Sequence, residues 1–176
     1  MSGLEDLYRE IILDHYRSPR NRGELETPPA HRAEGLNPLC GDEIVVYIAL
    51  DGEGSDEHRI VSDIKIGGQG CSISQSSASM MSAAVKGKSL AQIRDLTRTF
   101  KSMMSIHEAS LDVEGDTEDE PDLLDPTAVG KTLGDLEALR GVVKFPVRIK
   151  CATLSWNTLE QSIAEALSEP THDAPT

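Results

Sequence analysis

The stretch "DEIVVYIAL" (residues 42–50), followed closely by "HRIVSDIKI" (58–66), decides the fold. Both segments are rich in β-branched residues, which favour the extended backbone of a strand. Only the polar segment "DGEGSDE" (51–57) separates them, and this spacing predicts two antiparallel strands joined by a short loop. Directly before the first strand, "NPLCGDEI" (37–44) places Cys40 two positions from Asp42. This pair is either a turn that happens to contain a thiol or part of a metal site.

Helical patterns flank the two strands in the sequence. "SGLEDLYREIILDHYR" (2–17) carries an apolar stripe at helical spacing and ends before Pro19, and small residues from Ser72 to Gly87 indicate a closely packed helix. Residues 21–37 are expected to be loop with some extended structure. We expect further helices at 90–104, 132–141 and 151–167. The chain is therefore predicted to be an α+β domain, with a small antiparallel sheet covered by helices.

Length and charge restrict the classes of function. A chain of 176 residues fits one domain, and its formal net charge of -13 repels nucleic acid backbones. The beginning of the sequence does not resemble a signal peptide, and no apolar run approaches the roughly 20 residues of a membrane span. We expect a cytoplasmic protein with reduced thiols and with neither nucleic acid nor membrane as a partner.

Much of the negative charge lies in one segment. Residues 108–125 contain nine acidic residues and include Pro121, so a regular helix is not expected there. The sequence indicates a single domain over residues 1–167, an acidic insertion at about 107–130, and a flexible tail at 168–176. The insertion is either a solvated loop or a docking segment for a basic partner.

The three cysteines each lie at a predicted element boundary. Cys40 precedes the first strand, Cys71 follows a glycine turn at the start of a helix, and Cys151 opens the last helix. A helix N-terminus stabilises a thiolate, which is the form that binds metals and attacks sulfur. An odd number of cysteines argues against a closed set of disulfides, so metal binding or thiol chemistry is the main question.

Together with Asp42, the cysteines make four donors of the kind that suits tetrahedral zinc. Three thiolates and one carboxylate exceed the charge of a divalent metal, and Arg148 is a candidate for the compensating cation. Spacings of 31 and 80 positions between the cysteines form no known short metal motif, so the pattern alone is a weak signal. By itself, Asp42 fits a turn residue, Arg148 fits a surface ion pair, and His15 fits the edge of the core better than a ligand.

Four segments in order resemble the IscU/NifU-N family of iron–sulfur assembly proteins, and specifically its SufU branch. They are "LYREIILDHYRSPRN", "NPLCGDEI", "GGQGCSISQSSASMM" and "PVRIKCATLSW". The resemblance covers roughly residues 4–105 and 130–167. It implies a three-stranded antiparallel sheet packed against several helices, with a metal site at one end. It also implies that Cys40, Asp42, Cys71 and Cys151 are zinc ligands.

Two departures from IscU itself favour the SufU branch. IscU has a histidine immediately before the last cysteine, where this chain has Lys150, and IscU lacks the long insertion. The chaperone motif of IscU is also incomplete, since "KFPVRIK" retains only Pro146 and Val147 of it.

The SufU resemblance implies a zinc-dependent sulfurtransferase. Such a protein accepts persulfide sulfur from the cysteine desulfurase SufS and passes it toward downstream SUF cluster-assembly proteins. Cys40 would be the acceptor after a desulfurase histidine replaces it on zinc, and Arg148 would stabilise the freed thiolate. The first alternative is a non-enzymatic scaffold on which an iron–sulfur cluster is assembled, and the second is a structural zinc domain.

Overall fold

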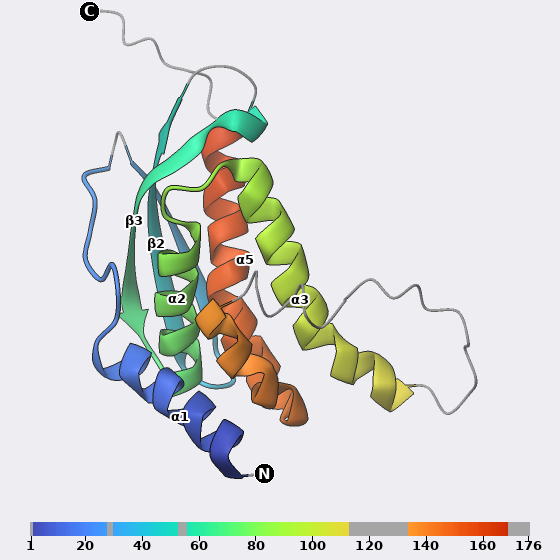
Figure 1. Cartoon of the computed structure of the whole chain (residues 1–176). Helices are drawn as coiled ribbons and strands as arrows, with labels where there is room; N and C mark the ends of the chain where they lie inside the picture. Colours follow the sequence, from blue (N-terminus) through green and yellow to red (C-terminus); the bar gives the residue numbers. More distant parts are fainter. Residues whose placement is uncertain (1, 28–29, 53–55, 113–133, 169–176) are drawn as a thin grey trace, which may run out of the picture.

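The computed structural model describes residues 2–27, 30–52, 56–112 and 134–168. Figure 1 shows a sheet on one side of the molecule and the long helices on the other. In chain order the elements are α1 (Ser2–Arg17), β1 (His31–Asn37), β2 (Asp42–Asp51), η1 (Asp56–His58), β3 (Ile60–Gln69), α2 (Ser72–Val85), α3 (Leu90–Asp112), the 3-10 helix η2 (Gly134–Lys144) and α5 (Pro146–Ser168).

The sheet has three antiparallel strands in the order β1-β2-β3, as the family resemblance implied. The predicted pair of strands forms its centre and one edge, with Val46 opposite Ile66 and Ile48 opposite Ile64. Alternate residues of β2 point to the same face, and on the helix side they are fully buried. This row of branched side chains supplies the sheet's share of the core.

Helices α2 and α5 pack against the sheet, α3 lies against α5, and α1 lies against α2 and η2 (Figure 1). Between α3 and α5, the rings of Phe100 and Trp156 stack with centroids 4.6 Å apart, and both side chains are fully buried. The aliphatic and methionine side chains of α2 complete a core that needs few aromatic residues. The start of α2, which follows β3, and the first turns of α5 thereby lie at the end of the sheet where β2 begins.

Two elements refine or correct the sequence predictions. β1 forms at residues 31–37, within the segment 21–37 expected to be loop with some extended structure, because it completes the ladder along β2. Helix α3 continues through Glu108 to Asp112, so the prediction against helix in the acidic run is wrong for its first residues. No proline or glycine occurs between Lys101 and Asp112 to end the helix earlier.

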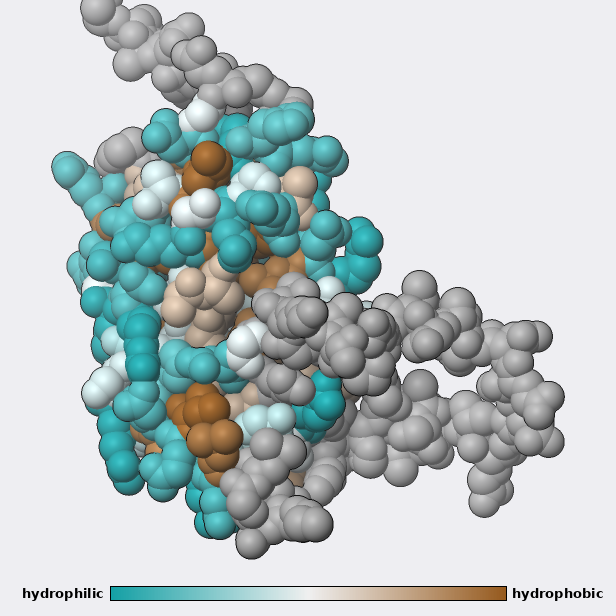
Figure 2. Space-filling view, viewed as in Figure 1, coloured by the Kyte–Doolittle hydropathy of each residue, from teal (hydrophilic) through white to brown (hydrophobic). Residues whose placement is uncertain are grey.

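The rest of the acidic insertion, 113–133, and the predicted tail after Ser168 lie outside the described residues, so the domain boundaries stay predictions. In the part of the chain that the structure describes, no helix has both the length and the apolar character needed to cross a membrane. On the face shown in Figure 2, hydrophilic residues cover most of the surface and hydrophobic residues appear in small separate patches.

Candidate metal centre

The turn between β1 and β2 carries Cys40. The backbone N–H of Cys40 donates to the carbonyl of Asn37 (3.2 Å), and Gly41 follows with a φ of 68°. Such a left-handed conformation is readily adopted by glycine, which lets the chain reverse immediately and enter β2 at Asp42. Cys40 is therefore partly exposed on a tight turn, as its position in the sequence predicted.

Asp42 is only 2% exposed, although it carries a carboxylate. Its Oδ1 accepts hydrogen bonds from the backbone N–H of Cys71 (2.9 Å) and from the hydroxyl of Ser74 (3.2 Å). Burial by itself would raise the pKa of Asp42. Hydrogen bonds from the Cys71 backbone and from the Cys151 and Cys71 thiols outweigh burial, so the pKa lies below its ordinary value. The carboxylate is held charged and in a fixed orientation.

Cys71 is the N-cap residue of α2, as predicted. Its Sγ accepts a hydrogen bond from the backbone N–H of Ser74 (3.5 Å), so the sulfur faces the positive end of the helix. Gly70 precedes it, and a side chain there would collide with the Asp42 carboxylate. A glycine is required at this position because the chain passes so close to Asp42.

Cys151 does not open its helix, which corrects the sequence prediction. Helix α5 begins at Pro146, a residue type favoured at the first helical position, so Cys151 lies in the second turn and is fully buried. The dipole argument therefore fails for this thiol. Burial first, and then hydrogen bonding to Asp42 and Cys40, raises the pKa of Cys151 above its ordinary range.

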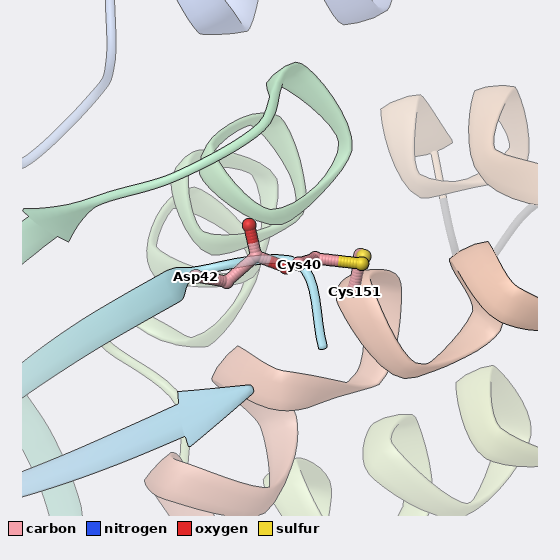
Figure 3. Close-up of side chains that lie close together, drawn as sticks. All are labelled: Cys40, Asp42 and Cys151. Carbon is pink, nitrogen blue, oxygen red and sulfur yellow. The ribbon is translucent and has the colours of Figure 1, made fainter. Parts of the chain in front are cut away.

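The ligand atoms of Cys40, Asp42 and Cys151 all lie within 4.8 Å of one another. Figure 3 shows the two sulfur atoms side by side, with the turn and α5 supplying them, and the Asp42 carboxylate next to them. Ligands of a tetrahedral zinc ion are about 3.5–3.8 Å apart, so a contraction of about 1 Å would bring these three atoms into range. The donor set and its geometry therefore fit zinc.

Cys71, the fourth predicted ligand, is not part of that group in the described structure. Its thiol nevertheless hydrogen-bonds with the Asp42 carboxylate, so its sulfur lies at the border of the cluster. A rotation of the Cys71 side chain away from the Ser74 N–H is the change that coordination by all four residues would need. The four-ligand set stays a prediction, with three of its members already together.

Arg148 lies next to these thiols, on the turn of α5 before Cys151. Charge on Cys71, and then charge on Cys151, raises the pKa of the exposed Arg148 guanidinium. The predicted compensating cation is therefore in place beside two of the sulfurs. Lys150, two residues later, is exposed.

A groove of about 730 Å³ opens beside the same two residues. Cys71 and Arg148 lie at its edge, and its walls come mainly from apolar side chains of α1, η2 and the segment before α5, among them Ile12, Val142 and Phe145. Phe145 and the neighbouring Val147 are exposed. The centre is thus bordered by an open apolar surface.

His15 is not near the centre. It is 2% exposed and hydrogen-bonds to Ser79 Oγ through Nδ1 (2.8 Å) and to Asp135 Oδ2 through Nε2 (3.0 Å). The prediction that it packs at the core edge is confirmed. Ser79 is fully buried and also accepts from the backbone N–H of Arg20, so this Ser–His–Asp arrangement joins α1, α2 and η2 and presents no accessible nucleophile.

Sequence reasoning missed two residues that contact the candidate ligands, Asn37 and Ser74. The Asn37 carboxamide lies 3.4 Å from Asp42 Oδ2 and 3.7 Å from Cys151 Sγ. Asn37 belongs to the same segment as Cys40, "NPLCGDEI", but only the pairing of β1 with β2 brings it opposite Asp42. Ser74 stood third after Cys71, which is the spacing of a residue that closes a helix cap.

The chain is therefore an α+β domain with a candidate cysteine–aspartate metal centre at one end of its sheet. The NifU-like N terminal domain family matches residues 7–152, and the chain belongs to this family. The match spans all four candidate ligands.

Among its relatives, the zinc-dependent sulfurtransferase SufU of Bacillus subtilis (strain 168) is 43% identical over 164 residues, covering 93% of this chain and 94% of that protein. The iron–sulfur cluster assembly scaffold protein IscU of Streptococcus pyogenes serotype M1 is 36% identical, with 93% and 86% covered. A crystal structure of a putative SUF-system scaffold protein from Fervidobacterium islandicum AW-1 has a TM-score of 0.66 at 29% identity, covering 92% of this chain and 99% of that one.

Proposed function

We propose that this chain is a zinc-dependent sulfurtransferase of iron–sulfur cluster assembly. It accepts persulfide sulfur from a SufS-type cysteine desulfurase on Cys40 and passes it to downstream SUF assembly proteins. The observation that carries this proposal is the convergence of Cys40, Asp42 and Cys151 with Arg148 beside them. The 43% identity to a relative named zinc-dependent sulfurtransferase supports the same reading.

The metal would be held by Cys40, Asp42, Cys71 and Cys151. When bound, zinc supplies the positive charge that keeps these thiols deprotonated at neutral pH. Burial raises the pKa of Cys151 in the metal-free protein, so that thiol depends most on the metal for its ionisation. Asp42 needs no such help, because its pKa is already low.

Cys40 is the sulfur best placed to react. It lies on the partly exposed turn, whereas Cys151 is fully buried in α5 and Cys71 caps α2. Its thiolate attacks the outer sulfur of the desulfurase persulfide, the sulfur–sulfur bond of that persulfide breaks, and the desulfurase cysteine leaves as a thiolate. One persulfide is consumed and one is formed, so the step needs no oxidant or reductant.

Arg148 would stabilise the negative charge that moves through the site. Its guanidinium lies beside Cys71 and Cys151. Because the side chain is exposed, it would be able to reach the sulfur of Cys40 once that sulfur has left the metal. The open apolar groove bordering Cys71 and Arg148 gives a partner protein access to this side of the centre. Both features favour a site that acts on a partner over a closed structural zinc site.

A scaffold for an iron–sulfur cluster is the second candidate. The same thiolates can bind iron, and relatives named IscU scaffold proteins match over most of the chain. Lys150 in place of the IscU histidine favours the sulfurtransferase.

The deciding experiment measures bound zinc and iron in protein purified without added metal, then titrates it into a cysteine desulfurase assay. We expect about one zinc per chain and a stimulated turnover that Cys40→Ala abolishes. Iron with a visible cluster chromophore would favour the scaffold, and zinc without any effect on the desulfurase would leave a structural zinc domain. A Cys40→Ser variant that accepts sulfur at the normal rate would refute the role of Cys40.

A further inference from the structure

Asn37 connects two of the candidate ligands that come from different elements. It is the last residue of β1, is 7% exposed, and pairs in register with Asp42 at the start of β2. Its Nδ2 donates to Asp42 Oδ2 at 3.4 Å and to Cys151 Sγ at 3.7 Å. A carboxamide has two N–H groups, so one group serves each acceptor.

The three candidate sulfurs differ in the nitrogen donors that surround them. Cys71 Sγ accepts from the Ser74 backbone, Cys151 Sγ accepts from Asn37, and the charge of Arg148 interacts with both Cys71 and Cys151. Among the described residues, no nitrogen donor hydrogen-bonds to the sulfur of Cys40. Cys40, the thiol on the turn between β1 and β2, is therefore the one without a nitrogen donor.

We propose that Asn37 is a positioning residue that fixes Asp42 and Cys151 as one unit of the centre and leaves Cys40 as the sulfur free to exchange. This inference rests on the proposed zinc site and assigns Asn37 a role in it. Hydrogen-bonding partners orient metal ligands and tune their strength as donors. An N–H donated to a thiolate withdraws electron density from the sulfur, so Cys151 becomes the less reactive sulfur and Cys40 keeps its full nucleophilicity.

The same contact fixes which oxygen of Asp42 is available. Oδ1 is held by the Cys71 backbone and Ser74, so Oδ2 is the oxygen that faces the sulfurs. Asn37 prevents this carboxylate from rotating, since both oxygens are tied to different elements. Loss of the Asn37 side chain would let the Asp42 carboxylate rotate. It would also leave the Cys151 sulfur without its N–H donor, so that Cys151 would compete with Cys40 as a nucleophile.

The test compares Asn37→Ala and the isosteric Asn37→Asp with Asn157→Ala and Asn157→Asp in the full-length chain. Asn157 is an exposed residue of α5, so its variants control for the lost amide and the added charge. Zinc affinity is measured by competition with a chelator, and we expect a loss of roughly 10- to 100-fold for both Asn37 variants. The Asn157 variants should stay within about threefold of the unmodified protein.

Two further readouts separate positioning from a general loss of structure. In cobalt-substituted protein, removing the N–H from Cys151 should move the sulfur-to-cobalt absorption band to lower energy. In zinc-loaded protein, limited alkylation followed by mass spectrometry should show label moving from Cys40 toward Cys151 in the Asn37 variants. Unchanged affinity, band position and label distribution would overturn the role of Asn37 while leaving the zinc site intact.

If the Asn37 variants do not fold, the cobalt-substituted unmodified protein still tests the part of the inference that leaves Cys40 as the sulfur free to exchange. Its alkylation must label Cys40 before Cys71, since the two thiols are similarly exposed and differ in their donors. Labelling of Cys71 first would overturn the proposed asymmetry. An unmodified chain that binds neither zinc nor cobalt would refute the proposed function itself, which is a separate result.

Discussion

Replacing Gly70 by alanine should disturb the candidate centre without touching any predicted ligand. A Cβ at this position would lie 2.5 Å from Asp42 Oδ1 and 2.7 Å from Ser74 Oγ. Real Cβ atoms do not approach oxygen so closely, so the Asp42 carboxylate or the preceding backbone must move. The carboxylate has little room to move because it is buried and held by three hydrogen-bond donors.

The size of the effect follows from the contacts that are lost. Displacing Oδ1 breaks its hydrogen bonds from the Cys71 backbone and the Ser74 hydroxyl, and bonds to a charged group contribute about 1.5–3 kcal/mol each. Partial relaxation would recover some of this, so we expect the free energy of unfolding to fall by about 3–4 kcal/mol. Zinc affinity should also fall by roughly 10-fold or more, because Asp42 would no longer be aligned with the sulfurs.

Urea unfolding of the metal-free protein measures the first quantity, and chelator competition measures the second. Gly141→Ala is the matched control, because a Cβ there meets nothing within 4 Å, and its free energy of unfolding should change by less than about 1 kcal/mol. If Gly70→Ala were as stable as the control and bound zinc equally well, the crowded contact between Gly70 and Asp42 would not exist in solution.

Three other predictions concern charge, pH and the core. Arg148→Ala should reduce stimulation of the desulfurase about 10-fold at unchanged zinc content. Lys150→Ala removes the same charge two residues away and should leave the stimulation unchanged. Equal effects of the two substitutions would contradict a specific role for Arg148. In the metal-free protein, burial raises the pKa of Cys151 above its ordinary 9.0. The protonated Cys151 thiol therefore contributes its full stabilisation below about pH 9, and this contribution is lost as the pH rises further. The free energy of unfolding, measured from about pH 8 to 11, should fall less steeply with pH for Cys151→Ala than for the unmodified protein. Phe100→Ala should lower the free energy of unfolding by about 3–5 kcal/mol, because it removes the stacked partner of Trp156. Unfolding can be followed by the fluorescence of Trp156, the single tryptophan of the chain. A loss below about 1 kcal/mol would contradict the prediction.

The sequence predicted the parts of the fold that depend on local pattern. The runs of β-branched residues predicted β2 and β3, which pair as expected. Ser89 and Gln92 form a reciprocal cap before α3, which is another feature that depends on local sequence. The bounds of β1 could not be predicted, because "HRAEGLN" has little apolar content and its place depends on long-range contacts. Gly35 shows this, since α5 passes so close that any side chain there would meet Thr158.

The candidate site was predicted by resemblance and not by spacing. Cys40, Cys71 and Cys151 are too far apart in the sequence for their distances to indicate a shared centre. Cys151 was expected to open the last helix, but α5 starts five residues earlier at Pro146, and the burial of this thiol depends on tertiary packing that the local sequence does not show. The contact of Asn37 with Cys151 joins β1 to α5, and no feature of the sequence near either residue indicates it.

The candidate centre brings together residues from four parts of the fold. Cys40 comes from the turn, Asp42 from β2, Cys71 from the cap of α2 and Cys151 from α5. A metal bound by all four would cross-link the sheet to both helices and stabilise the fold in proportion to its affinity. Release of Cys40 would open only the turn, because Asp42, Cys71 and Cys151 are held by hydrogen bonds that do not involve it. In the proposed zinc site, Cys40 would therefore exchange for chemistry while Asp42, Cys71 and Cys151 would keep the metal and the surrounding elements together.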